Sequence, residues 1–331
     1  GNRFGNEDRN FNQYAGTLRG AYEVTPDVGE GDAPVATVRI EPGARFKFAD
    51  PRIDWGLQPP SAEVVAAGAT EMRLTPGAPG RAVDIVGAEG RIVAAAQKRG
   101  YADVAASPRE VIVDHADQTV RPTFRIVAGD LVKLDGLDIA QPGRTNTAWL
   151  RRLAPWNSGD AYDPEDVAEL ERRLLDTGVY DSVTVALAPK AKQTAEGLRP
   201  VVISLADRAP RSIELGASYS TSEGVGLDAK WTRYNVLGRA DTLAAIGRLS
   251  NIDSRLGAEL TLPHWRRPQQ TLKLGGGGYS TNTDAYNETG FGLHGDLQRR
   301  FGKTSYINYG PTLGFRRAQG RQGAVLTPPG R

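Results

Sequence analysis

The chain has 331 residues, of which 41 are basic and 39 acidic, with three histidines and no cysteine. This length exceeds one ordinary domain, so about two to four domains are expected. The absence of cysteine excludes disulfides, thiol catalysis and cysteine-based metal sites, and the balanced charge gives no sign of a nucleic-acid-binding surface. Hydrophobic residues make up 39% of the chain, and no run of about 18 apolar residues could form a transmembrane helix.

The first two thirds of the sequence contain an internal repeat. Residues 38–48 match residues 124–134, with Arg, Ile, Gly and Lys at equivalent positions. A second landmark is a glycine that recurs at Gly20, Gly100 and Gly178, separated each time by about the length of one small domain. Three copies at near-constant spacing indicate a tandem array of domains.

Each repeat reads as strand, helix, helix, glycine, strand, strand. In the third copy Asp163 suits the N-cap and Pro164 the first position of the second helix. Gly178 is expected to end that helix in a left-handed conformation. The opening strand, the first helix and the two closing strands of this copy are predicted at residues 131–139, 145–153, 180–187 and 201–205.

The second copy follows the same pattern, and the first is incomplete. In the second, a helix through Ile85 and Ile92 stops at Gly100, and strands follow at 102–113 and 119–127. The first keeps only the last turn of its helix and two closing strands. The chain begins with Gly1 and no signal peptide, which favours a mature or truncated form. The domains predicted are a partial first repeat, a second repeat, a third repeat and a β-domain, at 1–43, 44–128, 129–208 and 209–331.

After Arg211 the pattern changes to strict alternation of apolar and polar residues, with tight turns between the segments. About seven strands of the length that crosses a bilayer at a tilt are predicted, at 213–219, 225–231, 243–249, 256–262, 271–279, 289–299 and 304–315. A soluble sheet also alternates, but the uninterrupted meander favours a membrane barrel, as do aromatics near strand ends, namely Trp231, Tyr234, Trp265, Tyr279, Tyr286, Phe301 and Tyr306. Seven strands would leave an open edge, so only part of a barrel is expected.

No catalytic constellation stands out. His115, His264 and His294 lie far apart in different predicted elements, so a metal site or a catalytic triad is not expected. The four glycines at 275–278 lack the Lys-Ser/Thr of a phosphate loop and predict a thin or bending strand instead. We therefore expect no enzyme activity, no cofactor and no metal, and a function carried by surfaces.

The first β-hairpin resembles a known family. Residues 215–224 read LGASYSTSEG and residues 233–239 read RYNVLGR. They are similar to the opening hairpin of the BamA/TamA outer-membrane assembly superfamily, which reads G-x-x-Y-S-T-x-x-G and then N-L-F-G-R. Val236 and Leu237 stand where that family has Leu and Phe. The repeats look like POTRA domains, which are β-α-α-β-β modules, and three copies resemble the TamA branch most.

The resemblance implies α+β POTRA repeats in the periplasm, followed by part of an antiparallel transmembrane β-barrel in the outer membrane of a Gram-negative cell. It implies a protein without enzymatic activity that receives unfolded outer-membrane or autotransporter proteins and inserts them into the bilayer. A TamB-like partner that spans the periplasm from the inner membrane is implied as well. Nucleic acid is not an expected partner.

The resemblance also implies a site, namely the first barrel strand. It would pair weakly with the last strand, open as a lateral gate and template incoming strands by β-augmentation, through Ile213, Leu215, Gly216, Ala217, Ser218 and Tyr219. One alternative is a two-partner secretion pore, which exports a polypeptide through its lumen. Another is a soluble periplasmic binding protein with a β-domain.

Overall fold

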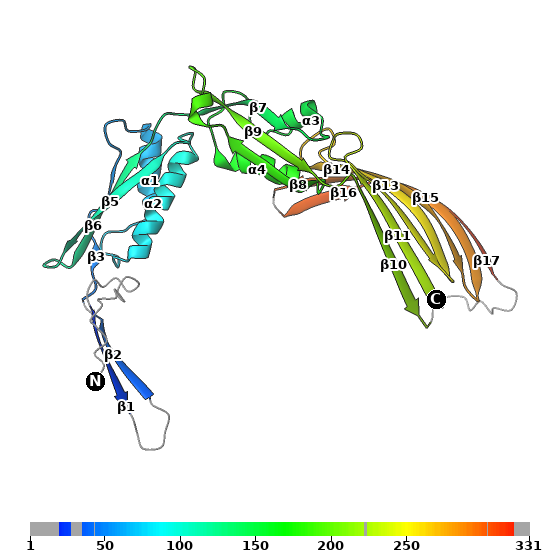
Figure 1. Cartoon of the computed structure of the whole chain (residues 1–331), viewed down its shortest axis with the longest axis horizontal. Coiled ribbons are helices and arrows are strands. Elements are labelled where there is room, and N and C mark those ends of the chain that lie inside the picture. The colour runs from blue at the N-terminus through cyan, green and yellow to red at the C-terminus, as the bar shows by residue number, and fades with distance from the viewer. Residues whose placement is uncertain (1–19, 28–34, 43, 222–223, 303, 321–331) are drawn as a thin grey trace, which may run out of the picture. The chain divides into compact units, whose positions relative to one another are not determined.

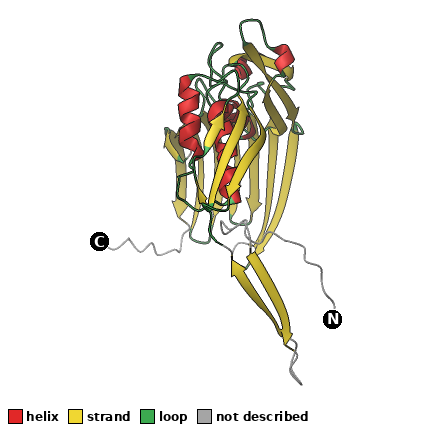
Figure 2. Ribbon diagram, turned by 90° about the vertical axis from the view of Figure 1, so that its left-hand side faces the viewer, coloured by secondary structure: helices red, strands yellow, loops and turns green. Residues whose placement is uncertain are grey.

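The computed structural model describes residues 20–27, 35–42, 44–221, 224–302 and 304–320. The chain divides into two compact units, one of residues 1–133 and 159–164 and the other of residues 134–158 and 165–331. Figure 1 labels the elements in chain order. Strands make up most of the described residues and helices a small part, as Figure 2 shows.

The first unit begins with a two-stranded hairpin. Strand β1 (Gly20–Asp27) pairs antiparallel with β2 (Val35–Pro42), so that Gly20 lies opposite Pro42 and Asp27 opposite Val35. The hairpin occupies the position expected for the two closing strands of the first repeat. The helical turn expected before Gly20 lies outside the described residues.

A β-α-α-β-β module follows in the same unit. Two short strands pair in parallel with consecutive parts of β6 and together form one interrupted opening strand, while β5 lies antiparallel on the other side of β6. The opening strand is interrupted around Asp50, which has a φ of 47°. The elements are β3 (Lys47–Phe48), β4 (Arg52–Asp54), α1 (Ala62–Met72), α2 (Ala82–Gln97), β5 (Ala105–Asp114) and β6 (Thr119–Val127).

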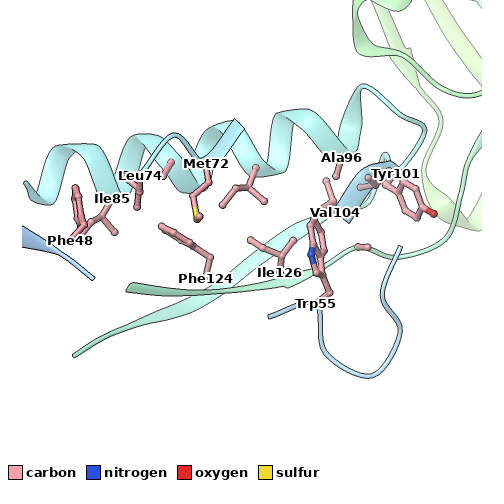
Figure 3. Close-up of a cluster of buried hydrophobic side chains, with 14 of the residues drawn as sticks. Phe48, Trp55, Met72, Leu74, Ile85, Ala96, Tyr101, Val104, Phe124 and Ile126 are labelled. Atoms are coloured by element: carbon pink, nitrogen blue, oxygen red, sulfur yellow. The ribbon is translucent and has the colours of Figure 1, made fainter. Parts of the chain in front are cut away.

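Both helices of this module pack on one face of its sheet. Phe124 and Ile126 of β6 point toward the helices (Figure 3), and both are buried, as is Ile92 of α2. Burying one large apolar side chain contributes about 1.5–3 kcal/mol, so this cluster stabilises the module. Gly100 has a φ of 96°, which agrees with its predicted role beyond the end of α2.

A second module has the same order of elements. Its three-stranded sheet runs β7-β9-β8. Asn146 caps the first helix, because its Oδ1 accepts hydrogen bonds from the backbone N–H groups of Ala148 and Trp149. Gly178 has a φ of 70°. The predicted β-α-α-β-β order is confirmed, with β7 (Lys133–Gln141), α3 (Thr147–Arg151), α4 (Pro164–Leu175), β8 (Tyr180–Leu187) and β9 (Leu198–Asp207).

The last part of the chain is one antiparallel sheet of eight strands with the order β10 to β16, in which β17 also pairs with β15. Figure 1 shows these strands side by side. No helix in the described ranges is long and apolar enough to cross a membrane. The strands are β10 (Arg211–Ser220), β11 (Gly224–Tyr234), β12 (Thr242–Ser250), β13 (Asp253–Leu262), β14 (Gln270–Asn282), β15 (Tyr286–Phe301), β16 (Ser305–Tyr309) and β17 (Thr312–Gly320).

The eight strands occupy the seven predicted positions, since β16 and β17 are two parts of one. Tyr309 of β16 lies opposite Leu297, and Thr312 of β17 lies opposite His294, in the same register along β15. The break falls at Pro311, which has no backbone N–H to continue the ladder. The fold class predicted from the sequence, POTRA-type repeats followed by a partial antiparallel barrel sheet, is confirmed.

The two faces of this sheet differ in polarity. One face carries large apolar side chains that remain exposed, such as Leu215 at 80% and Leu256 at 71%. The other face carries ion pairs between neighbouring strands, such as Glu214 with Lys230 at 3.7 Å. A continuous exposed apolar face is unusual in water and is typical of the lipid-facing side of a membrane barrel.

The glycines at 275–278 lie within β14, which confirms the predicted thin strand. A Cβ atom on Gly277 would lie 2.6 Å from the backbone oxygen of Leu256 on β13. The register also aligns four glycines in a row on the polar face, and we call this the glycine row. Its members come from β13, β14, β15 and β17, and are Gly257, Gly277, Gly292 and Gly314.

Candidate functional site

Strand β10 forms one edge of the large sheet. Within the described residues it pairs with β11 alone, along its whole length from Arg211 to Ser220. The backbone groups on its other side are therefore available for pairing. Three of the predicted site residues are largely exposed on the apolar face, Ile213 at 69%, Leu215 at 80% and Tyr219 at 76%.

The remaining predicted site residues take their places from the hairpin register. Ala217 shares the apolar face with Ile213 and lies opposite Leu227. Gly216 and Ser218 lie on the polar face, opposite Asp228 and Gly226. A Cβ on Gly226 would come within 2.6 Å of the Ser218 hydroxyl, so a glycine leaves room for that side chain. The structure thus brings the six predicted residues together in one open-edged strand.

The turn between β11 and β12 is fixed by its own side chains. Asp241 is fully buried, and its carboxylate accepts hydrogen bonds from the backbone N–H groups of Val236 at 3.0 Å and Leu237 at 2.8 Å. Asn235 closes the turn, because its N–H donates to the backbone oxygen of Asp241 over 2.6 Å. Asn235 and Gly238 both have positive φ angles, 54° and 70°. The Asn-Val-Leu-Gly segment is therefore a rigid turn.

This turn contacts residues 142–146, the loop between β7 and α3 of the second module, which we call the clamp loop. Asn235 Nδ2 donates to Thr145 Oγ1 over 2.9 Å, and Thr145 Oγ1 lies 2.7 Å from Tyr180 Oη. The backbone N–H of Asn146 donates to the oxygen of Gly238 over 2.8 Å. Thr145 and Asn235 are buried. Burial also raises the pKa of Tyr180 to about 12, so its phenol stays neutral at ordinary pH.

The clamp loop also holds the segment that leads into β10. The backbone N–H of Arg144 donates to the Asp207 carboxylate over 2.6 Å, and its guanidinium donates to the oxygen of Arg208 over 2.9 Å. The Arg208 guanidinium in turn lies 5.2 Å from the ring centre of Tyr234, at the end of β11. One loop therefore fixes both ends of the β10–β11 hairpin at the base of the candidate site.

The clamp-loop contacts form one joint between the second module and the sheet. A second joint links α4 to the turn between β13 and β14. His264 Nε2 lies 3.0 Å from the backbone oxygen of Arg173, and His264 Nδ1 accepts from the N–H of Gln269 over 2.9 Å. Since Nδ1 is an acceptor, the proton of the neutral ring is on Nε2, which donates to Arg173. Burial lowers the pKa of His264, which favours this neutral form.

Glu169 completes the second joint. Its carboxylate accepts from Gln269 Nε2 at 2.8 Å and from Arg173 Nε at 2.9 Å. Burial alone would raise the pKa of Glu169, but hydrogen bonds from Arg172, Arg173 and Gln269 together lower it. The glutamate is therefore charged where it holds the turn.

The histidines do not form a common site. The ring of His115 packs edge-on against Phe46 at 5.3 Å, and His294 Nε2 lies 3.5 Å from Glu259 on the polar face of the sheet. In the part of the chain that the structure describes, no group of three or more metal-ligating side chains comes together. Sequence reasoning missed the clamp loop and the role of His264, because both depend on residues about ninety positions apart.

Comparison with solved structures supports the fold. No family model matches the chain. BamA from Haemophilus ducreyi lacking POTRA domains 1–3 is similar with a TM-score of 0.69 at 19% identity, over 84% of this chain and 52% of that one. CdiB from Acinetobacter baumannii follows at 0.48 and 14%, over 85% and 55%. POTRA3-5 of Haemophilus influenzae BamA follows at 0.42 and 20%, over 60% and 77%.

Of these three structures, the Haemophilus ducreyi BamA is the one similar enough to support a conclusion about the fold. The chain spans about half the length of that BamA and has the fold of its POTRA-and-barrel region. At the level of the fold, the resemblance to the BamA/TamA superfamily is confirmed. The likeness gives no preference for the TamA branch.

Proposed function

We propose that the chain is part of an outer-membrane assembly factor without enzymatic activity. Its β10 edge would receive strands of unfolded outer-membrane or autotransporter proteins. The observation that carries this proposal is an edge strand with an open backbone and an exposed apolar face in a BamA-like fold. The apolar face of the sheet supports a place in the outer membrane, and the POTRA fold supports a periplasmic place for the modules.

The domain division proposed with this function has four parts. The first hairpin would belong to one POTRA domain, two further POTRA modules would follow it, and the large sheet would belong to the barrel. The boundaries are 1–43, 44–128, 129–208 and 209–331. The division is supported by the two observed β-α-α-β-β modules.

The chemistry of the proposed step is β-augmentation. An incoming extended segment would form main-chain hydrogen bonds with the free side of β10, and these give affinity without a preference for sequence. Ile213, Leu215 and Tyr219 would set the register, because a matching segment must place its apolar residues on the same face. Hydrogen bonds and lipid burial supply the driving force, so no nucleotide or covalent step is needed.

The clamp loop gives this site a fixed base. It holds the segment before Arg211 and the turn after Tyr234, while Ser218 and Ser220 lie at the other end of β10. The bilayer and, by resemblance, a TamB-like inner-membrane protein are the further partners of the proposed assembly factor.

Cysteine cross-linking tests the proposal directly, since the chain has no cysteine of its own. Ser218→Cys is combined with single cysteines along the last strand of an outer-membrane substrate during its assembly. Ser254→Cys, on the apolar face of β13 inside the sheet, is the control for a strand that is paired on both sides. We expect disulfides from position 218 at alternate substrate positions and none above background from position 254.

Two results would contradict the proposal. Equal cross-linking from positions 218 and 254 would mean that β10 is not a pairing edge. Cross-links from Lys273→Cys, on the polar face of β14, in place of position 218 would indicate that a polypeptide passes along the lumen, as in a secretion pore.

A further inference from the structure

Four arginines lie at one end of the large sheet, and we call them the arginine rim. Arg266 and Arg267 lie in the turn between β13 and β14, and Arg299 and Arg300 lie at the end of β15. The two pairs are adjacent, because Gln270 lies opposite Arg299 and the Arg300 N–H donates to the oxygen of Gln269 over 3.0 Å. All four side chains are exposed.

Two of these arginines stack on aromatic rings. The Arg266 guanidinium lies 4.6 Å from the ring centre of Trp265, and that of Arg299 lies 4.9 Å from the ring centre of Phe301. A ring holds a guanidinium by one face and leaves the N–H groups at its edge free to donate. Held in this way, the fork of N–H groups matches the oxygens of a phosphate.

The rim borders the apolar face of the sheet. Arg299 is on the same face as Leu297, which lies two residues earlier in β15, opposite Leu272. Ile307, opposite Arg299, is exposed at 56%. In a protein with this face in hydrocarbon, the rim would lie at the level of the lipid headgroups, where arginine and aromatic side chains are favoured.

The charge of the rim is largely uncompensated. Among the described residues, one of the four arginines forms an ion pair with a carboxylate, Arg300 with Asp176 at 3.3 Å. The opposite end of the sheet has mixed charge, with the Arg255–Asp253 pair at 2.6 Å near Arg316 and Glu288. The rim therefore favours an anionic partner at this end of the sheet alone.

We propose that the arginine rim binds the phosphate groups of anionic phospholipids in the adjacent bilayer leaflet. The proposal rests on the proposed function for the place of the sheet in a membrane. It adds a lipid preference that strand pairing at β10 does not require. Trp265 and Phe301 would orient Arg266 and Arg299 toward the headgroup.

The test measures which lipids the full chain retains. The purified protein is mixed with vesicles of equal parts phosphatidylglycerol and phosphatidylethanolamine, solubilised again and analysed by native mass spectrometry. The variant Arg266→Gln/Arg299→Gln is compared with Arg316→Gln/Arg317→Gln, two arginines near the other end of the sheet. We expect a several-fold excess of phosphatidylglycerol on the unmodified chain and on the second variant, and equal retention on the first.

Equal retention of both lipids by the unmodified chain would overturn the proposal, and so would the same loss of preference in both variants. Circular dichroism of each variant checks that the sheet has formed. The Ser218 cross-link is measured on the same variants. In the chain with all its arginines unchanged, absence of that cross-link with an intact lipid preference would refute the proposed function and leave the lipid site standing. The reverse result in that chain would refute the lipid site alone.

Discussion

Asn235 of the β11–β12 turn donates a hydrogen bond to Thr145 of the clamp loop over 2.9 Å, and both side chains are buried. Asn235 Oδ1 also accepts from the N–H of Ala240 over 3.0 Å. One amide thus satisfies a group in its own turn and a group in the α+β module. The base of the first hairpin is therefore fixed by a side chain that uses both its amide nitrogen and its amide oxygen.

Replacing Asn235 by alanine should destabilise this junction. The buried N–H of Ala240 would lose its acceptor, and a buried group left unsatisfied costs about 1–3 kcal/mol. Thr145 Oγ1 would lose its donor from Asn235 and keep Tyr180. Urea unfolding of the detergent-solubilised chain and hydrogen exchange of the β10 and β11 amides measure the effect. Asn287→Ala, at an exposed position on β15, is the control and should change the stability by less than about 0.5 kcal/mol. An equal effect of both substitutions would contradict the role of Asn235.

A substitution at Gly238 tests the contact between this turn and the clamp loop, separately from the cost of a left-handed backbone. Gly238 and Gly302 have φ angles of 70° and 68°, so alanine pays a left-handed penalty of about 1–2 kcal/mol at either position. Around Gly302 a new Cβ meets open space, but at Gly238 it lies 3.2 Å from the oxygen of Arg144. Gly238→Ala should therefore destabilise the chain more than Gly302→Ala. Equal unfolding midpoints would show that the clamp loop tolerates displacement.

The glycines of β14 should differ sharply although they are neighbours. A Cβ at Gly277 would lie 2.6 Å from a backbone oxygen of β13, whereas at Gly278 the nearest atom is 3.5 Å away. Gly277→Ala must push two strands apart, at a cost of about 1–3 kcal/mol by analogy with overpacked cores, and Gly278→Ala should be tolerated. The measurement is the free energy of unfolding of both variants. A Gly277→Ala variant more stable than Gly278→Ala would contradict the close approach of β13 to Gly277.

The joint at His264 should weaken in acid. Its pKa in the folded chain is below the ordinary 6.5, so the unfolded chain binds the proton more readily. Stability is then fully present above about pH 6.5 and falls as the pH drops from there toward the lower folded value. Charged groups facing the ring are Arg173 and, more weakly, Asp176 and Glu169. Protonated Nδ1 would also oppose the N–H of Gln269.

Unfolding measured between pH 7 and pH 5 tests this dependence. His264→Gln should flatten the decline, because the titrating group is removed. His115→Gln, in the turn between β5 and β6, serves as the reference for a histidine substitution away from this joint. The same slope in His264→Gln would assign the decline to another group.

The local elements were predictable because their signals are local. The alternation of apolar and polar residues from Ile213 onward predicted the positions of the seven strands, and Gly100 and Gly178 marked the ends of two helices. The first helix of the third repeat is shorter than the predicted 145–153, because the Asn146 side chain caps Ala148 and Trp149 and starts it at Thr147. The break at Pro311 was visible in the sequence but was not predicted.

The candidate site was predictable only in part. The family-like hairpin pointed to β10, whose pairing role remains a proposal. The contacts that fix its base involve Thr145 and Tyr180, which have no motif around them. Hydrogen bonds between residues so distant in sequence follow from how the module and the sheet come together, which no local periodicity records.

The glycine row has a mechanical consequence for the sheet. Four adjacent strands carry no side chain at the aligned positions Gly257, Gly277, Gly292 and Gly314. When strands bend toward their concave side, side chains on that side collide first, and along this line there are none. The row is therefore a line across the strands at which the sheet can bend toward its polar face. The sheet should be stiffer on either side of this line.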